Sequence, residues 1–217
     1  MYTAILVDGG FYRRRAQSVY GTKTPQERAN ELEEYCKKLL HKEKAGSCLL
    51  YRIFYYDCPP MGKKIYNPYT KKQVDCSSTD LYKWMNDFLS ELKKHRKFAL
   101  RMGKLSEAQA HYELAPDVLK KLCNGKIEFE NLTESDFKLA IDQKGVDMKI
   151  GLDIASLAYK KQVQQILLIS GDSDFVPAAK LARREGIDFI LDPMGANIKD
   201  DLFEHIDGLR SCVPKKK

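Results

Sequence analysis

The sequence predicts an α/β fold in which a mostly parallel sheet lies between two layers of helices. Short apolar runs at residues 3–7 and 165–169 end in turn-forming glycine and aspartate, which is the pattern of buried strands. Stretches such as residues 81–94 and 146–159 carry apolar side chains at helical spacing. Strands that alternate with helices in this way favour a parallel sheet with both faces covered.

The N-terminal half begins with the strand at 3–7, which Asp8-Gly9-Gly10 ends. A helix is predicted over 27–44, because Leu32, Tyr35 and Leu39 recur among charged residues and Gly46 follows. A second strand is predicted over 48–56, where β-branched and aromatic residues precede Asp57. Residues 60–79 are polar and irregular, so we interpret them as a long loop before the helix at 81–94 and a third strand at 98–105.

Residues 106–143 do not follow the alternation, and we interpret them as an insertion in a single domain that spans 1–217. Within the insertion we expect a helix at 114–122, a strand or loop at 127–132 and a short helix at 134–141. A chain of 217 residues is long enough for one core with an inserted subdomain.

The last third alternates clearly between helices and strands. It predicts a helix at 146–159, a strand at 165–169 and a helix at 175–185 that Gly186 ends. A strand at 187–191 follows and stops at Asp192-Pro193, and a closing helix is expected at 199–205.

The composition is that of a soluble globular protein with a basic balance. Hydrophobic residues make up 43% and charged residues 31%, and the formal net charge is +7. This charge favours anionic partners such as nucleic acid, although solvated faces give the same balance. No apolar run approaches the ~18 residues of a membrane span, and the first seven residues lack a basic secretory segment, so we expect a cytoplasmic protein. No feature of the sequence supports a homo-oligomer.

Several enzyme and cofactor classes lack their motifs. The six cysteines form no CxxC pair, and the four histidines have no zinc-ligand spacing and no nucleophile motif beside them. The chain also contains no GxGxxG and no phosphate-binding P-loop sequence.

Acidic residues follow two of the predicted strands. Asp8 ends the first strand, and Asp172 and Asp174 follow the strand at 165–169. Ligands of open parallel sheets bind beyond the carboxyl ends of the strands. Asp147 lies near the start of the helix that precedes the later strand. Asp153 lies six residues farther along, about 240° past a full turn, so these two residues do not share one helix face.

Carboxylates gathered at one sheet edge repel each other unless a hard cation lies between them. Mg²⁺ and Mn²⁺ prefer oxygen ligands, and such a cation activates water and neutralises charge on a phosphodiester. Arg13, Arg14 and Arg15, just past Asp8, are candidates for holding the substrate backbone. The alternative is that the aspartates only cap helices and form turns, and that the arginines face water.

Four stretches of the chain resemble the NYN domain family, in particular its LabA-like bacterial branch. They occur in the order of the family at residues 5–10 (ILVDGG), 55–57 (YYD), 144–149 (KGVDMK) and 168–175 (LISGDSDF). NYN domains belong to the PIN-like nuclease superfamily. The resemblance therefore implies a Rossmann-like PIN/NYN three-layer sandwich and a metal-dependent ribonuclease site.

By this resemblance the catalytic residues are expected to be Asp8, Asp147, Asp172, Asp174 and, with less weight, Asp153. Asp8, Asp147 and Asp172 would bind Mg²⁺ or Mn²⁺, and RNA would be the partner.

The chain departs from the family pattern at two places. Phe11 stands where many NYN nucleases have asparagine, and the acid supplied by the second helix of PIN nucleases has only Asp57 and Asp80 as candidates. Because of these departures, an alternative function remains open, in which the protein binds RNA or a protein partner without cutting RNA. A metal-dependent phosphatase ranks lowest, because Gly9-Gly10 follows Asp8 where aspartate phosphatases have a second acid.

Overall fold

The structure is a computed structural model that describes residues 1–41 and 48–214. Its central element is a six-stranded parallel sheet with the order β12-β11-β10-β1-β2-β5. The strands are β1 (Tyr2–Asp8), β2 (Leu49–Asp57), β5 (Phe98–Met102), β10 (Gln165–Ile169), β11 (Asp188–Asp192) and β12 (Gly208–Leu209). The predicted α/β fold with a mostly parallel sheet is confirmed.

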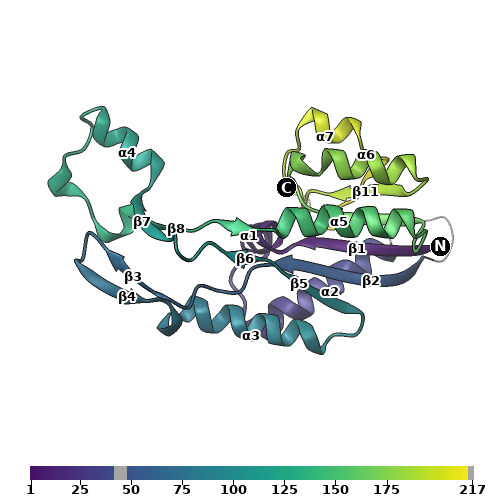
Figure 1. The fold of residues 1–217 in the computed structure, drawn as a ribbon, viewed down its shortest axis with the longest axis horizontal. Helices are drawn as coiled ribbons and strands as arrows, with labels where there is room; N and C mark the ends of the chain where they lie inside the picture. Colours follow the sequence, from purple (N-terminus) through teal and green to yellow (C-terminus); the bar gives the residue numbers. More distant parts are fainter. Residues whose placement is uncertain (42–47, 215–217) are drawn as a thin grey trace.

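Helices cover both faces of this sheet (Figure 1). One layer holds α1 (Gly9–Tyr20), α2 (Pro25–His41) and α3 (Asp80–Lys94), and the other holds α5 (Val146–Tyr159), α6 (Val176–Arg184) and α7 (Asp200–Glu204). Alternate residues of β1 point to opposite layers, so Ile5 and Val7 pack with the first layer and Ala4 and Leu6 with the second. A strand buried on both faces reads as a continuous apolar run, which is why the sequence predicted these strands well.

The chain changes direction across the sheet at β1. From β1 it moves through β2 to β5, and after α5 it returns to β10 on the other side of β1. The strand order therefore reverses between β1 and β10, whose last paired residues are Val7 and Ile169. In open α/β sheets the crevice at such a point is the usual ligand site.

An arm extends from the carboxyl edge of the sheet (Figure 1, left). We define the arm as residues 62–78 and 104–144. Its first part is the hairpin of β3 (Lys64–Asn67) and β4 (Lys72–Asp75), and its second part holds β6 (Lys104–Leu105), β7 (His111–Leu114), α4 (Pro116–Cys123), β8 (Phe137–Ala140) and β9 (Gln143–Lys144). β6 pairs with β9 and β7 with β8, both antiparallel, and β3 packs against β7.

Several local predictions were wrong, mainly in the arm. Residues 60–79 are not all loop, because β3 and β4 pair as a hairpin whose Ile65 is buried against the second part of the arm. Residues 134–141 are a 3₁₀ turn at Glu134–Asp136 followed by β8, not a helix. The partner strand β7 is far away in sequence, so local spacing gave no sign of this pairing.

Other boundaries differ in smaller ways. The strand expected at 98–105 is interrupted at Gly103, where a Cβ would lie 2.8 Å from the carbonyl oxygen of Lys144. Residues 127–132 take the loop alternative, with a 3₁₀ turn at Phe129–Asn131. The sequence also missed the short strand β12. The expected end of the helix at 27–44, residues 42–44, lies outside the described residues. Among the described helices, none is both long and apolar enough to cross a membrane.

Candidate active site

Asp8 is the best anchored of the predicted acidic residues. It is the last residue of β1 and the N-cap of α1, and its Oδ1 accepts a hydrogen bond of 3.0 Å from the Phe11 N–H. Its Oδ2 accepts a hydrogen bond of 3.2 Å from the hydroxyl of Ser170. The Ser170 hydroxyl also accepts a 3.3 Å bond from the N–H of Asp172, so this buried side chain links the ends of β1 and β10.

Gly9 allows α1 to begin directly after Asp8. A Cβ at this position would lie 2.5 Å from Cζ of Tyr55 and 2.6 Å from the carbonyl oxygen of Tyr56. No side chain fits at these distances, so only glycine lets the chain turn against β2 and present Asp8 at the sheet edge. Gly10 is different, because a Cβ there meets nothing nearer than 3.6 Å.

Asp147, Asp172 and Asp174 are exposed at the same edge. Asp147 lies in the first turn of α5, which Gly145 starts in the left-handed conformation with φ of 80°. Asp172 caps the short turn after β10, since its Oδ1 accepts a 3.0 Å hydrogen bond from the N–H of Asp174. Helix and turn capping, the alternative considered from the sequence, is thus a real part of what Asp8 and Asp172 do.

The carboxylates also repel one another, which capping alone does not explain. Burial raises the pKa of Asp8 and the charge of Asp147 raises it further, while the Phe11 N–H and the Ser170 hydroxyl lower it. The pKa of Asp147 is raised by burial and then by the charges of Asp172 and Asp174. We call Asp8, Asp147, Asp172 and Asp174 the acidic cluster.

The acidic cluster fits a hard divalent cation that keeps most of its water. The ligand atoms it offers are carboxylate oxygens, and a bound cation would relieve the repulsion between the negatively charged carboxylates. In the described part of the chain, however, no three acidic, histidine or cysteine side chains converge as a ready ligand set. Mg²⁺ is usually held by one or two carboxylates with several waters, and this arrangement suits that mode.

Asp153 lies apart from the acidic cluster. Its Oδ2 accepts hydrogen bonds of 2.8 Å from the Tyr56 hydroxyl and 3.1 Å from Nε of Arg101. The structure therefore gives Asp153 a role in fastening α5 to β2 and β5. This agrees with its position on another helix face than Asp147.

Neither candidate for the second-helix acid joins the acidic cluster. Asp57 is fully buried and accepts four hydrogen bonds, two from Arg13 at 2.9 and 3.1 Å, one from the Tyr55 hydroxyl and one from the Cys58 N–H. These donors occupy both carboxylate oxygens, so Asp57 has none free for a cation. Asp80 lies exposed in the first turn of α3.

The three arginines of α1 have different surroundings. Arg13 is bound to Asp57, and Arg15 donates to the carbonyl oxygen of Met194 at 2.8 Å. Arg14 is exposed, and within residues 1–41 and 48–214 it has no hydrogen-bond or ion-pair partner. Its charge acts on Asp8 and lowers that residue's pKa, although burial dominates and raises it. Of the three arginines, Arg14 is thus the one whose side chain is open to solvent near the acidic cluster.

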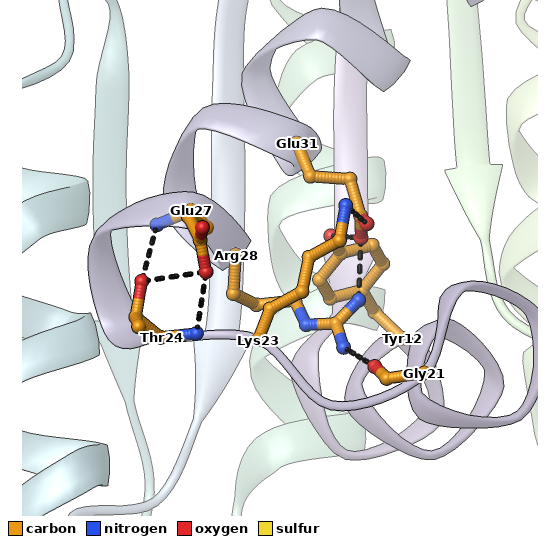
Figure 2. A network of polar contacts seen from close by, with 7 residues as sticks. All are labelled: Tyr12, Gly21, Lys23, Thr24, Glu27, Arg28 and Glu31. Atoms are coloured by element: carbon orange, nitrogen blue, oxygen red, sulfur yellow. Dashed lines mark hydrogen bonds and ion pairs between the residues drawn. The ribbon is translucent and has the colours of Figure 1, made fainter.

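Nearby basic residues at the start of α2 are engaged within the protein (Figure 2). The Glu31 carboxylate forms ion pairs with Nη1 of Arg28 and with Nζ of Lys23, both at 2.6 Å. It also accepts a hydrogen bond of 3.0 Å from the Tyr12 hydroxyl. Thr24 and Glu27 form a capping box, in which the Glu27 carboxylate accepts from the Thr24 N–H at 2.9 Å. This network fixes the connection between α1 and α2, and it removes Lys23 and Arg28 from the set of free cations.

The sequence does not predict the roles of three residues at this edge. Ser170 stands out only as part of the motif at 168–175, and no pattern points to Gln143. Phe11 is a departure from the family pattern, and in the structure its ring covers Gly171, where a Cβ would lie 2.9 Å from Cε2. The signal for Ser170 in the sequence is its place directly after the apolar run at 165–169 and two residues before Asp172. The place of Gln143 depends on the arm and could not be read from spacing.

Comparison with known proteins identifies the family. The family model described as NYN domain matches residues 68–203, which include Asp147, Asp172 and Asp174 and begin after Asp8. No curated protein matches the chain. A crystal structure of a protein of unknown function from Vibrio parahaemolyticus is similar, with a TM-score of 0.47 and 12% identity over 96% of this chain and 90% of that one. The match of the family model covers most of the chain, which therefore belongs to the NYN domain family, whose fold is nuclease-like.

Proposed function

We propose that this protein is a ribonuclease that hydrolyses phosphodiester bonds of RNA with Mg²⁺ or Mn²⁺. The observation that carries the proposal is the acidic cluster at the point where the strand order reverses. Asp8, Asp147 and Asp172 come there from three separate segments of the chain, and burial raises the pKa of Asp8 and of Asp147. The charge of Asp147 acts in the same direction on Asp8, and the charges of Asp172 and Asp174 do so on Asp147. Membership of a family with a nuclease-like fold supports the same activity.

Each residue of the acidic cluster has its own role in the proposed reaction. Asp8 is held rigidly by Phe11 and Ser170, so its carboxylate offers a fixed position for a cation. Asp147 lies in the first turn of α5, close enough for its charge to act on Asp8, and Asp172 and Asp174 extend the negative edge. A divalent cation held there supplies charge neutralisation and activation of water. Arg14 holds the phosphate backbone beside the cluster.

The test is cleavage of an end-labelled, mixed-sequence RNA by the wild-type protein and by Asp172→Asn. Both are incubated with Mn²⁺, with Mg²⁺ and with EDTA, after circular dichroism has established that both fold. The proposal predicts products only from the wild type with a metal. RNA cleavage in EDTA, or equal cleavage by both proteins, contradicts it.

A second candidate function is RNA binding without cleavage. It is favoured by the Phe11 ring, which lies over Gly171 at the edge of the acidic cluster, and by Asp57, whose oxygens are all engaged. RNA that binds without any metal-stimulated product, with an affinity that falls steeply with salt, would support this alternative.

A further inference from the structure

An apolar cavity of about 500 Å³ lies where the arm meets the sheet. We call it the root cavity. One wall comes from the end of β2 and from α3, with Cys58 and Leu81, and the other comes from the arm, with Tyr112, Ile141 and Gln143. Cavities of this size, mostly apolar and with a few polar groups, are typical of small-ligand sites. A nucleobase, with apolar faces and a polar edge, has the matching chemistry.

The root cavity reaches the acidic cluster through Gln143. The position of a Cβ on Gly10 lies 3.6 Å from Oδ1 of Asp8 and 3.8 Å from Oε1 of Gln143. Both distances start from the same point, so Oδ1 of Asp8 and Oε1 of Gln143 can be no farther apart than the sum of the two. The wall that contains Cys58 is near Asp8 as well, because Asp8 pairs with Tyr56 of β2, two residues before Cys58. A group in the root cavity would thus be a close neighbour of a phosphate at Asp8.

A basic and aromatic surface continues from the root cavity along α1 and α3. A second cavity, of about 470 Å³, shares Arg13 and Leu81 with it and is also lined by Arg14 and Trp84. Arg14 is the arginine whose charge acts on Asp8, so it lies within electrostatic reach of the acidic cluster. The arrangement gives a cation for the backbone outside and an apolar cavity for a base inside, which is the pattern of single-strand binding sites.

We propose that the root cavity holds one unpaired nucleobase of the substrate, next to the phosphate at the acidic cluster, with the Gln143 amide against the polar edge of the base. This inference rests on the proposed function. A base enters such a cavity only when it leaves its stack and its pair, which costs least in a single strand. The arm then selects the substrate, because without it the cavity has only one wall.

The experiment measures binding without cleavage. Fluorescence anisotropy in EDTA compares a labelled single-stranded RNA hexamer with a ribose-phosphate hexamer of the same charge that carries no bases. The wild type is expected to bind the hexamer with bases about fivefold or more tightly, from the loss that removal of one stacking contact causes. The same RNA in a duplex is expected to bind more weakly than the single strand.

Two exposed leucines provide the variant and its control. Leu81→Glu places a negative charge at the rim of the root cavity, whereas Leu119→Glu places the same charge on α4, whose Leu119 does not line the cavity. The side chains of Leu81 and Leu119 are 67% and 48% exposed, so both variants should fold. For each protein we take the ratio of its affinity for the hexamer with bases to its affinity for the hexamer without bases. Because the two hexamers carry the same charge, this ratio cancels the effect of the added glutamate charge on backbone binding. We expect Leu81→Glu to bring the ratio close to one and Leu119→Glu to leave it unchanged.

Each outcome decides the inference separately from the nuclease activity. Equal binding of both hexamers by the wild type, or an unchanged ratio in Leu81→Glu, overturns the base site even if RNA is cleaved with Mn²⁺. A ratio that Leu81→Glu abolishes supports the base site even if no cleavage is ever detected, and the proposed function then fails alone.

Discussion

Replacement of Asp57 by asparagine tests whether this strand-end acid is structural or catalytic. The new amide would keep one acceptor oxygen but place its N–H₂ group toward donors, since Arg13 and the Tyr55 hydroxyl both donate to Oδ2 of Asp57. Removal of one partner of a buried ion pair costs about 3–5 kcal/mol. Arg13 keeps 25% of its side chain exposed, so water can replace part of the interaction. We therefore expect Asp57→Asn to lower the free energy of unfolding by about 2–4 kcal/mol.

Thermal and urea unfolding measure this loss. In a chain of 217 residues, 1 kcal/mol shifts Tm by about 2–4 °C, so Tm should fall by about 5–15 °C. Asp80→Asn is the control, because Asp80 is exposed and its replacement should change stability by no more than about 0.5 kcal/mol. An Asp57→Asn protein with the Tm of the wild type and no metal-dependent cleavage would refute the reasoning, since Asp57 would then act as a catalytic group.

Three further predictions concern the sheet edge. Gly9→Ala should destabilise the protein by about 1–3 kcal/mol or more because of overpacking against Tyr55, whereas Gly10→Ala should be neutral or stabilise by up to about 1 kcal/mol, as urea unfolding can show. The raised pKa of Asp8 means that its contribution to stability is fully present below the unfolded pKa near 3.8 and is lost as pH rises through the folded pKa. In EDTA, Asp8→Asn should therefore gain stability relative to the wild type as pH rises above about 4, and an unfolding series that shows no such gain contradicts a raised pKa of Asp8. Arg14→Ala should weaken RNA binding and reduce the dependence of log Kd on log salt by about one charge, whereas Arg15→Ala, which loses a contact to a carbonyl oxygen, should leave that dependence nearly unchanged.

The sequence predicted the sheet and most of its helices because their signals are local. Strands such as β10 are apolar on both faces, and α3 carries its buried side chains at helical spacing, so neither needs distant partners to be recognised. The end of α6 was also visible in the sequence, because Gly186, two residues after the helix, takes the left-handed conformation with φ of 81°. The arm was predicted poorly, because β7 and β8 are defined by pairing across a long separation.

The site was predicted in part. The ends of β1 and β10 could be matched because parallel strands finish at one edge, and this placed Asp8 and Asp172 near each other. The roles of Asp57 and Arg13 could not be read, since both depend on one buried ion pair between α1 and β2. Asp153 shares a helix with Asp147 but turns toward Tyr56, and only the tertiary structure shows what each of the two contacts.

That separation provides the most direct test of the central claim, which is that the acidic cluster carries the chemistry. RNA cleavage with Mn²⁺ is measured for Asp147→Asn and Asp153→Asn, two identical changes on α5. The proposal predicts that Asp147→Asn lowers the rate by at least about 100-fold with its fold intact. It predicts that Asp153→Asn stays within about threefold of the wild type and loses only about 1–2 kcal/mol of stability through Tyr56 and Arg101. Full activity in Asp147→Asn, or an equal loss in both variants, would contradict the account.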